Sequence, residues 1–312
     1  MKKFGMTGIA GYVAPRHLKA IKETSNVLSA CFDPHDSVGI IDQYFPNADY
    51  FAEYERFERH LNQLAKKPDT QIDYLTICSP NNIHDSQIRL ALNVGADAIC
   101  EKPMVLYPRN LDILQVLEEK TDKKVYTVMQ LRCHPSLLSL KELLEKDSSE
   151  KKHKVELTYV TSRGNWYNYS WKGNIEKSGG IATNIGIHLF DLLIWLFGSV
   201  EKSEVYLSEI NRMSGLLELK NAEVVWFLSI DKNDLLRYQF QADKSTFRSI
   251  KIDSKEIEFS EGFADLHTKV YKEILNGNGL RIKDARASIE TVYDIRFSEI
   301  LKKKDLFHPF LR

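Results

Sequence analysis

The sequence predicts an α/β fold of two domains, in which a doubly wound parallel sheet is followed by an α+β domain on a mostly antiparallel sheet. The length of 312 residues suits two ordinary domains. In the first part of the chain, short apolar runs alternate with helical patterns, which is typical of a parallel sheet covered by helices. After the charged segment "EKDSSEKKHK", apolar runs follow one another without helices between them, as antiparallel strands do. We therefore expect domains at residues 1–130 and 131–312.

The first domain is expected to alternate strands and helices from its start. Its short apolar runs predict strands at 3–9, 27–33, 73–79, 97–102 and 124–130. Its stretches with apolar residues three and four apart predict helices at 15–24, 54–67, 84–95 and 109–121. Parallel strands need such crossover helices, so this order supports a doubly wound sheet.

The second domain is expected to contain strands at 155–163, 204–210, 222–230 and 247–253. Between the first two of these lies "SGGIATNIGIHLFDLLIWLFG", which predicts a strongly apolar helix. The C-terminal stretch "KDARASIETVYDIRFSEILKKK", residues 283–304, predicts one amphipathic helix that ends in a basic run. Strands and helices of this kind predict an α+β domain.

Composition excludes several classes of partner. Lysine plus arginine and aspartate plus glutamate each number 43, so the formal charge is zero and no basic field indicates nucleic acid or an anionic membrane. The N-terminal stretch lacks the apolar region of a signal peptide, and no uncharged apolar run of about 18 residues occurs. We expect a cytoplasmic protein with a small-molecule partner. The cysteines form no CxxC pair, which indicates reduced, packed thiols at Cys31, Cys78, Cys100 and Cys133.

A turn that could bind phosphate follows the first predicted strand. In "GIAGYVA", Gly8 and Gly11 would let the backbone approach a pyrophosphate, while the next helix offers its free N–H groups to the anion. Ala14 and Pro15 suit the start of that helix. The pattern is a relaxed dinucleotide-binding, or Rossmann, turn, although an ordinary strand-to-helix connection also explains it. The turn residues expected to contact the cofactor are Gly8, Ala10, Gly11 and Tyr12.

Asp33 decides which dinucleotide we expect. It ends the second predicted strand, 25 residues after Gly8, where its carboxylate can accept hydrogen bonds from the adenosine ribose. A carboxylate there would repel a 2′-phosphate. The expected cofactor is therefore NAD rather than NADP.

Other cofactor contacts are expected where the later strands end, because ligands bind at the carboxyl edge of open α/β sheets. His84 is the first residue of the helix predicted at 84–95 and could instead be a structural helix-start residue. We expect His134, after the strand predicted at 124–130, to be structural. The contacts expected at this edge are Ser79, Pro80, Asn81, His84 and Gln130, with Arg132 close to the last of them.

The segment "ICEKPM" places Glu101 and Lys102 at the same edge, where the strand predicted at 97–102 ends. Pro103 cannot continue the strand ladder, so it determines how the chain leaves the sheet. A lysine near the positively charged nicotinamide ring and out of bulk water suits a hydrogen bond to a reacting hydroxyl or transfer of its proton. A surface lysine paired with Glu101 is the structural alternative. We expect Lys102 to face the cofactor, with Glu101 as a neighbouring contact.

Three polar residues interrupt the apolar helix of the second domain. Asn184, His188 and Asp191 are spaced i, i+4 and i+7, so we expect them to share one helix face. They could simply satisfy each other in the core. Alternatively, His188 is a base that takes the proton of a secondary alcohol, because imidazole titrates near neutral pH. No metal is expected, since HExxH and paired cysteine motifs are absent.

The segment "TSRGNWYNYSWKG" follows the first strand of the second domain and is rich in cations and aromatics. Cations suit a carboxylate or diphosphate, and hydrogen-bonding aromatics suit a sugar. An exposed loop with packed tryptophans is the structural alternative. The expected substrate contacts are Arg163, Asn165, Trp166, Tyr167 and Lys172, together with Lys102, Asn184 and His188.

The glycine turn, "EKP" and "GGxxxxxGxHxxD", in this order and at this separation, resemble the Gfo/Idh/MocA family of oxidoreductases across essentially the whole chain. The resemblance implies catalytic roles for Lys102 and His188. Many members of that family have an aspartate where this chain has Asn184, so this position cannot serve here as an acid or base. The resemblance also implies a tetramer, although burial within a monomer explains the same apolar strands.

Finer strings narrow the resemblance. "GIAGYVAPRHLKAIK", "TSRGNWY", "ATNIGIH" and "EGFADLHT" are similar to the branch that oxidises UDP-N-acetylglucosaminuronic acid (UDP-GlcNAcA) at C3. That resemblance implies a UDP-sugar uronic acid as substrate, a 3-keto product for an aminotransferase in bacterial surface polysaccharide (O-antigen) synthesis, and a 2-oxo acid as a candidate oxidant of NADH. A dehydrogenase of another sugar or polyol, and a non-enzymatic NAD-binding sensor or co-repressor, stay open as alternatives.

Overall fold

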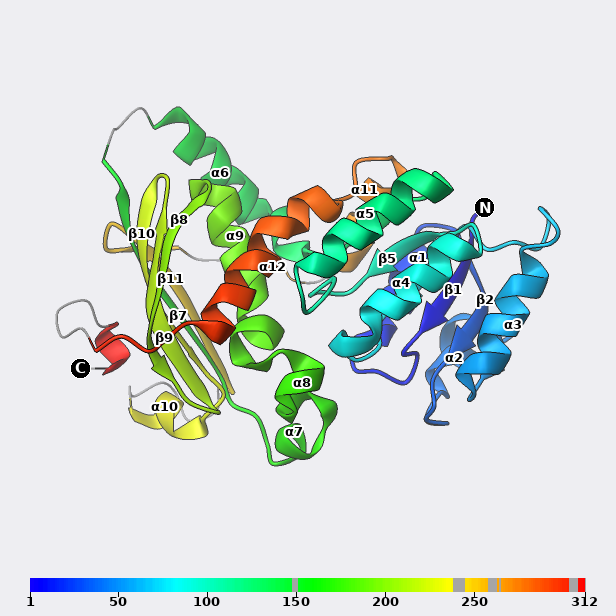
Figure 1. Ribbon diagram of the computed structural model, residues 1–312, viewed down its shortest axis with the longest axis horizontal. Helices are drawn as coiled ribbons and strands as arrows, with labels where there is room; N and C mark the ends of the chain where they lie inside the picture. Colours follow the sequence, from blue (N-terminus) through cyan, green and yellow to red (C-terminus); the bar gives the residue numbers. More distant parts are fainter. Residues whose placement is uncertain (148–150, 238–244, 258–262, 264, 303–307, 312) are drawn as a thin grey trace. The chain divides into compact units, whose positions relative to one another are not determined.

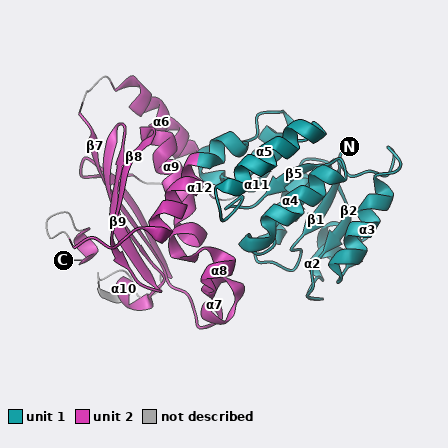
Figure 2. Ribbon diagram, viewed as in Figure 1, with its two compact units in different colours: residues 1–133, 264–286 teal, residues 134–263, 287–312 magenta. Residues whose placement is uncertain are grey.

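The computed structural model describes residues 1–147, 151–237, 245–257, 263, 265–302 and 308–311. The chain divides into two compact units, of which the first comprises 1–133 and 264–286 and the second 134–263 and 287–312 (Figure 2). The segment 264–286, which the sequence analysis placed in the second domain, thus belongs to the first unit. Residues 261, 262 and 264 of "EGFADLHT", and residues 303 and 304 of the predicted C-terminal helix, lie outside the described residues.

The first unit is built on a parallel sheet, which confirms the predicted doubly wound fold (Figure 1). The strand order is β3-β2-β1-β4-β5-β6, so the order reverses between β1 and β4. Ligands of such sheets bind at the carboxyl ends of the strands near that reversal. The strands are β1 (Lys3–Thr7), β2 (Val27–Phe32), β3 (Asp49–Phe51), β4 (Tyr74–Ile77), β5 (Asp97–Cys100) and β6 (Val125–Thr127).

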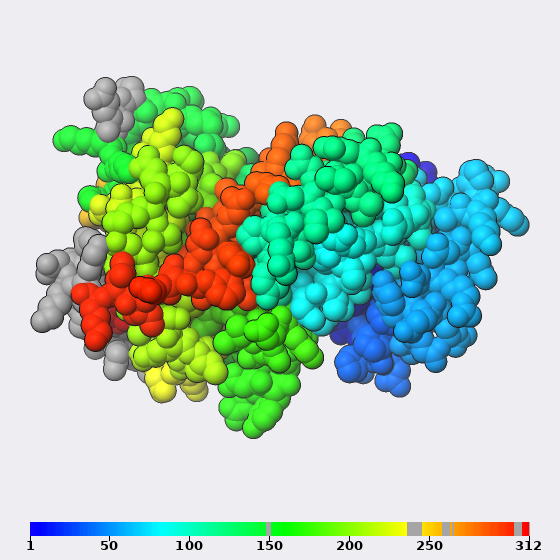
Figure 3. Space-filling model, viewed as in Figure 1, coloured from blue at the N-terminus to red at the C-terminus, as the bar shows by residue number. Residues whose placement is uncertain are grey.

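Helices cover this sheet. α1 has Pro15 in its first turn, as predicted, and packs against α11 from the returning segment. α4 and α5 pack together and form a continuous surface in the space-filling view (Figure 3). The helices are α1 (Ala14–Glu23), α2 (Ile40–Tyr44), α3 (Tyr54–Leu64), α4 (His84–Asn93), α5 (Arg109–Thr121) and α11 (Leu266–Leu275), with short turns η1 (Asn81–Ile83) and η2 (Gln130–Cys133).

The second unit is built on a mixed sheet in the order β12-β11-β7-β10-β9-β8, in which β7 and β10 are parallel and the other pairs antiparallel. This confirms the mostly antiparallel α+β domain. The run "RMSGLLEL" also forms a strand, β9, although its glycine and serine weaken the strand pattern. The strands are β7 (His153–Thr161), β8 (Val200–Ser208), β9 (Arg212–Leu219), β10 (Ala222–Ser229), β11 (Thr246–Ile252) and β12 (Lys255–Glu256).

The apolar helix of the second unit packs on this sheet, with the Phe190 ring edge-on to Trp226 of β10 at 5.3 Å. It is preceded by a π-helical turn, η4, in which Gly186 allows close approach, because a Cβ there would lie 2.6 Å from Leu228 Cδ1. The helices are α6 (Pro135–Lys146), α7 (Trp166–Tyr169), α8 (Ile175–Ser178), α9 (Ile187–Phe197), α10 (Lys232–Arg237) and α12 (Ile282–Phe297, which begins in the first unit), with η3 (Trp171–Gly173), η4 (Ala182–Gly186) and η5 (Pro309–Leu311).

One helical stretch of the described residues, Ile175–Phe197, is long and apolar enough to cross a membrane by length and composition. However, 72% of its most apolar window is buried inside the protein. Core helices of soluble proteins have the same character. We therefore interpret this stretch as a core element of the second unit.

The four cysteines are free, as predicted. Cys31, Cys78 and Cys100 are buried, and Cys133 is half-buried. Burial raises the pKa of each thiol, to about 12 at Cys31, so these groups stay protonated and pack as small apolar side chains.

Candidate functional site

The glycine turn between β1 and α1 has the geometry that close backbone approach requires. Gly8 adopts a φ of +76°, and a Cβ there would lie 2.5 Å from the carbonyl carbon of Cys78. The Gly11 amide donates to the Gly8 carbonyl at 3.0 Å, and a Cβ on Gly11 would lie 2.9 Å from that oxygen. Only glycine satisfies both positions without displacing backbone. Of the other predicted turn contacts, Tyr12 is 84% exposed.

Asp33 lies directly against this turn. Its Oδ2 accepts a hydrogen bond from the Ala10 amide at 3.0 Å, and its Oδ1 accepts one from the His35 amide at 3.0 Å. These bonds hold the buried carboxylate at the end of β2, next to the start of α1. A carboxylate can accept about four hydrogen bonds, so two backbone donors leave capacity for the hydroxyls of a ribose.

The end of β4 is joined to β1 through a buried amide that the sequence analysis did not single out. Gln87 Oε1 accepts hydrogen bonds from Thr7 Oγ1 at 2.6 Å and from Ser79 Oγ at 2.7 Å. Gln87 lies within α4, and no motif marks it as different from other polar helix residues. Pro80 and Asn81 follow Ser79 and begin η1, so the predicted contacts at this edge do lie at a strand end.

His84 is a buried residue at the start of α4. Its Nδ1 lies 2.7 Å from the Pro103 carbonyl oxygen and its Nε2 lies 2.9 Å from that of Ser79. Burial lowers the pKa of His84, although the two carbonyls act in the opposite direction. A neutral imidazole has one N–H and donates to one of them. This geometry agrees with the structural alternative, in which His84 ties the end of β4 to the segment after β5.

Lys102 lies in a segment whose backbone is held on both sides. The Glu101 amide donates to the Ile77 carbonyl at 2.9 Å, and the Lys102 amide lies 3.2 Å from Glu101 Oε2. On the other side, Pro103 is the residue that contacts His84. The Lys102 side chain itself is partly exposed, beyond the carboxyl end of β5.

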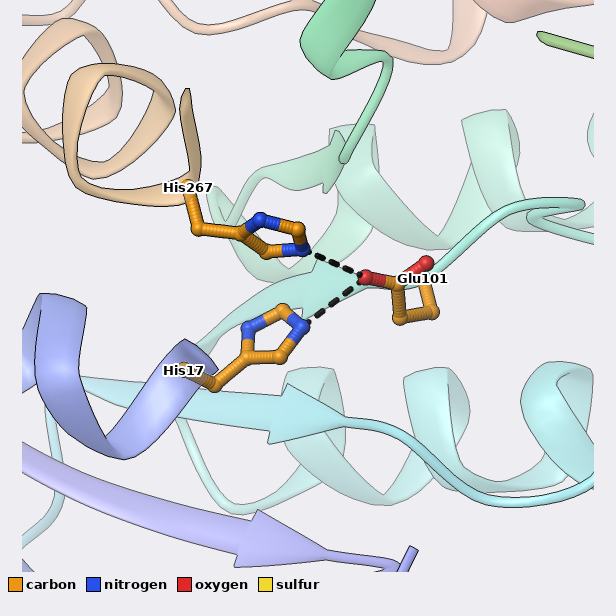
Figure 4. A group of neighbouring side chains, drawn as sticks. All are labelled: His17, Glu101 and His267. Carbon is orange, nitrogen blue, oxygen red and sulfur yellow. Dashed lines mark hydrogen bonds and ion pairs between the residues drawn. The ribbon is translucent and has the colours of Figure 1, made fainter. Parts of the chain in front are cut away.

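Glu101 is the centre of a buried cluster that the sequence analysis missed (Figure 4). Its Oε1 lies 2.9 Å from His17 Nε2 and 3.2 Å from His267 Nε2. Burial alone would favour the protonated carboxyl, but the hydrogen bonds from both histidines hold the pKa of Glu101 well below its usual range. The side-chain atoms of His17, Glu101 and His267 that could bind a metal lie within 4.8 Å of one another, as a metal site would require. The sequence did contain one sign of this cluster, because His17 is a histidine on an otherwise apolar face of α1.

Gln130 begins η2 after β6, as its predicted role requires. Its Oε1 is buried and has no hydrogen-bond partner among the described residues. A buried amide oxygen normally has a partner, so a ligand that donates a hydrogen bond would complete this site. Arg132, two residues on, donates to the Asp284 carbonyl at 3.1 Å. His134 is buried beside Phe263, which agrees with a structural role.

In the second unit, four predicted substrate contacts come together. Asn184 Nδ2 donates to the Tyr167 hydroxyl at 2.9 Å. Burial raises the pKa of Tyr167, while Asn184 and the nearby charge of Arg163 lower it. Burial, and then the charge of Arg163, lower the pKa of Lys172. The structure thus places two cations, a phenol and an amide within one cluster, supplied by the end of β7, by α7, by η3 and by η4.

The two cations of this cluster have no carboxylate partner among the described residues. Lys172 Nζ instead lies over the rings of Trp171 and Trp166, at 4.4 and 5.7 Å from their centroids. The Arg163 amide donates to the Ile230 carbonyl at 3.2 Å, which fixes its backbone while its side chain is exposed. Neighbouring like charges without an anion are unfavourable, so the cluster is suited to an anionic ligand. Asn165 and Trp166 are also exposed here.

The three polar residues of the apolar helix differ in burial. Asn184 and His188 are partly exposed within an otherwise buried stretch, whereas Asp191 is 1% exposed. That all three share one helix face stays a prediction. The π-helical turn η4 contains Asn184 and precedes α9, so it changes the angular spacing that a regular helix would give.

The turn, the carboxylate after β2 and the unpartnered amide of Gln130 fit a dinucleotide, and the strand order is that of a nucleotide-binding dehydrogenase domain. The class is therefore that of NAD-binding Rossmann oxidoreductases. Residues 2–129 match the family model described as oxidoreductase family, NAD-binding Rossmann fold, and residues 141–305 match the C-terminal alpha/beta domain of the same family. The chain belongs to the Gfo/Idh/MocA oxidoreductase family.

Two solved structures of one protein resemble this chain over its whole length. The WlbA (WbpB) dehydrogenase from Thermus thermophilus, in complex with NAD and UDP-GlcNAcA, has 48% sequence identity and a TM-score of 0.96, and the match covers 100% of both chains. The same dehydrogenase in complex with NAD and alpha-ketoglutarate has 49% identity and a TM-score of 0.95, again over 100% of both chains.

Curated relatives match over shorter stretches. The myo-inositol 2-dehydrogenase of Thermotoga maritima is 27% identical over 138 residues, which are 44% of this chain and 40% of that protein. The chain thus matches well under two thirds of the length of this relative.

Proposed function

We propose that this protein is an NAD-dependent dehydrogenase that oxidises the C3 hydroxyl of UDP-GlcNAcA to a ketone. The observation that carries the proposal is the 48% identity, over the full length of both chains, to a dehydrogenase that binds NAD and UDP-GlcNAcA together. The cation cluster of the second unit agrees with it, because the uronic acid and the diphosphate are both anions.

In this proposal, NAD is held by residues of the first unit. Gly8, Ala10, Gly11 and Tyr12 contact the pyrophosphate region, and Asp33 accepts hydrogen bonds from the adenosine ribose. The carboxyl edge supplies the remaining contacts: Ser79, Pro80, Asn81, His84, Glu101, Lys102 and Gln130. The chemistry that bound NAD supplies is acceptance of a hydride.

The reaction needs a proton acceptor as well as a hydride acceptor. His188 takes the proton of the C3 hydroxyl, while C3 loses its hydrogen together with both bonding electrons. The oxygen keeps the electrons of its O–H bond, so a C=O double bond forms. Lys102 hydrogen-bonds this oxygen as the negative charge develops on it. Asn184, as an amide, can orient the sugar but cannot accept the proton.

Recognition of the substrate falls to the cluster of the second unit. Arg163 binds the carboxylate through two parallel hydrogen bonds, because its planar guanidinium matches the geometry of that group. Lys172 binds a second negative group, and Tyr167 and Asn165 hydrogen-bond the sugar. Trp166 offers an exposed aromatic face to it.

The wider role is a further part of the proposal. The 3-keto sugar would serve an aminotransferase in bacterial surface polysaccharide synthesis, in the cytoplasm, with the dehydrogenase as a tetramer. A 2-oxo acid could reoxidise NADH by accepting the hydride and a proton to become a 2-hydroxy acid. The related Thermus dehydrogenase has been solved in complex with NAD and alpha-ketoglutarate, which supports this class of oxidant.

The test is to incubate purified protein with NAD and UDP-GlcNAcA. We expect NADH absorbance and a product lighter by two hydrogens, with the new carbonyl at C3 by NMR. UDP-GlcNAc and myo-inositol serve as comparison substrates. Faster oxidation of myo-inositol than of UDP-GlcNAcA would contradict the proposal and favour a polyol dehydrogenase, as in the Thermotoga relative.

A further inference from the structure

The cluster around Glu101 extends beyond the two histidines into a chain of hydrogen bonds. His17 Nδ1 lies 2.9 Å from the Tyr271 hydroxyl, which lies 2.9 Å from Thr76 Oγ1. Its members come from three elements of the first unit, β4, α11 and α1, and from Glu101, the residue after β5. Figure 4 shows His17, Glu101 and His267. His17 and Tyr271 are 0% exposed, and Glu101 and His267 are 7% and 6% exposed.

The chemistry of the groups gives these bonds one direction. A carboxylate only accepts, so both His17 Nε2 and His267 Nε2 carry the hydrogens that they donate to Glu101. Burial lowers the pKa of His17, which favours the neutral imidazole. With its hydrogen on Nε2, a neutral His17 accepts a hydrogen bond at Nδ1 from the Tyr271 hydroxyl, and the Tyr271 oxygen then accepts one from Thr76 Oγ1. In this order every hydrogen-bond donor of the cluster has an acceptor.

This series of hydrogen bonds ends beside Lys102. Glu101 uses Oε1 for the two histidines, and its Oε2 lies 3.2 Å from the Lys102 amide. If the Glu101 carboxylate turned or became protonated, its contact with the Lys102 amide would change. His267 and Tyr271, which belong to the segment 264–286, can therefore influence the position of Lys102 through Glu101.

We propose that Tyr271, His17 and His267 form a hydrogen-bonded brace that holds the Glu101 carboxylate and thereby positions Lys102. The three are positioning residues. The proposal rests on the proposed function, because it assigns them to the lysine of that reaction.

A metal ion in the same place is the competing explanation, since two imidazoles and a carboxylate are zinc ligands. The distances favour the brace. The nitrogens lie 2.9 and 3.2 Å from the carboxylate oxygen, which are ordinary hydrogen-bond lengths. Tyr271 and Thr76 complete the donor sequence without a metal.

The test compares two substitutions at one site. His17→Gln retains an N–H donor that can reach Glu101, whereas His17→Asn retains a partner for Tyr271 but is too short to reach the carboxylate. We expect His17→Asn to lower kcat by about tenfold, the effect of losing one hydrogen bond to a charged group. His17→Gln should stay within about twofold of the wild type. His267→Asn and His267→Gln should behave in the same way.

The pH profile separates positioning from a loss of stability. Glu101 is faced by His17 on α1, His267 and Tyr271 on α11, His84 on α4, and the thiols of Cys78 and Cys100. When the His17 donor is lost and only that of His267 remains, the pKa of the Glu101 carboxyl should rise, because burial favours its protonated form. The acid limb of the kcat profile should therefore move to higher pH in His17→Asn and not in His17→Gln. Tyr74→Phe is the control, because Tyr74 stacks on the same Phe4 ring as Tyr271.

Three results would overturn the brace. The first is equal kcat and equal pH profiles in His17→Asn and His17→Gln. The second is activity that a chelator abolishes and Zn²⁺ restores, with stoichiometric Zn²⁺ binding that His267→Asn removes; this would establish a metal centre.

The third result that would overturn the brace comes from a measurement without substrate. NMR of ¹⁵N-labelled histidines should show His17 as the neutral tautomer with hydrogen on Nε2, and Glu101→Gln should change its signals. A hydrogen on Nδ1 in the wild type would contradict the brace even if the protein oxidised another substrate.

Discussion

At the level of single residues, the proposed chemistry depends on a few side chains. Some of them lie in segments held by hydrogen bonds, and others lie near like charges. Lys102 lies in a segment held by hydrogen bonds, whereas Arg163 and Lys172 lie near each other without an anion among the described residues. Asp33 is held by two backbone donors. Each arrangement predicts a separate consequence of mutation.

Loss of either proposed catalytic residue should lower turnover. We expect Lys102→Ala and His188→Ala each to reduce kcat for UDP-GlcNAcA by at least about a hundredfold, as loss of one acid–base group does, while thermal unfolding shows that the fold survives. Lys154→Ala, at an exposed lysine of β7, is the control. Turnover near that of the wild type in either mutant would remove that residue from the mechanism.

Asp33 should set the choice of cofactor. Asp33→Ser removes the charge that binds the ribose hydroxyls and repels a 2′-phosphate, so binding of NAD should weaken and binding of NADP should improve. Calorimetric titration with both cofactors measures the change. If the wild-type protein bound NAD and NADP equally well, our placement of Asp33 would be incorrect.

Arg163 should distinguish the uronic acid from the neutral sugar. A bidentate contact with a carboxylate is worth about 1.5–3 kcal/mol, so Arg163→Leu should lower kcat/KM for UDP-GlcNAcA by about tenfold to a hundredfold. The slower oxidation of UDP-GlcNAc should change little. Arg56→Leu, at an exposed arginine of α3, is the matched control. An equal loss on both substrates would assign Arg163 to the diphosphate and leave the carboxylate to Lys172.

At the scale of elements, the π-helical turn and the helix after it determine where Asn184 and His188 lie. The turn packs against β10 at Gly186, where the backbone comes close to Leu228 and Phe190. A regular helix through the same residues would give Asn184 a different angular position. Close packing at Gly186 therefore contributes to the geometry of the proposed site.

Gly186→Ala should destabilise the fold. The added Cβ would lie 2.6 Å from Leu228 Cδ1 and 2.8 Å from Phe190 Cε2, so both side chains must move, and overpacking of this kind costs about 1–3 kcal/mol. Gly39→Ala is the control, because a Cβ there meets nothing within 4 Å. Chemical denaturation of the two variants measures the difference. Equal stability in both would show that β10 and η4 separate at no cost.

At the scale of the whole molecule, the segment 264–286 returns to the first unit after the chain has built the sheet of the second. Through α11 it adds His267 and Tyr271 to the first unit, where Tyr271 stacks on Phe4 of β1 at 5.9 Å. The core and the buried titratable cluster of that unit are thus completed by residues far along the chain. This gives the cluster a role in folding stability as well as in the proposed positioning of Lys102.

Stability should fall as the pH becomes acidic. Burial lowers the pKa of His17 and His84 in the folded protein, so their contribution is fully present above the unfolded pKa of about 6.5 and is lost as the pH falls through the folded pKa. Despite burial, hydrogen bonds from His17 and His267 hold the folded pKa of Glu101 well below its usual range, so it acts in the same direction at lower pH.

Thermal midpoints measured from about pH 8 to about pH 4 should therefore decline, and the decline should be shallower in His17→Gln, which has no imidazole to protonate. Midpoints that rise with acidity would contradict the directions given for these groups.

Local sequence patterns were enough to predict the two sheets and the places of several proposed site residues. Strand and helix periodicity is local, so β1, β2, β4, β5 and their helices followed from it, and motifs placed Gly8, Asp33, Lys102 and His188 at strand ends or on a helix. Which distant groups meet depends instead on how these elements pack together.

No sequence pattern predicts the contacts of His267 and Tyr271, because their partners lie more than 160 residues away. The bond between Gln87 and Thr7 likewise joins residues 80 positions apart. The π-helical turn, the burial of Asp191 and the return of 264–286 likewise depend on packing, which no local pattern encodes.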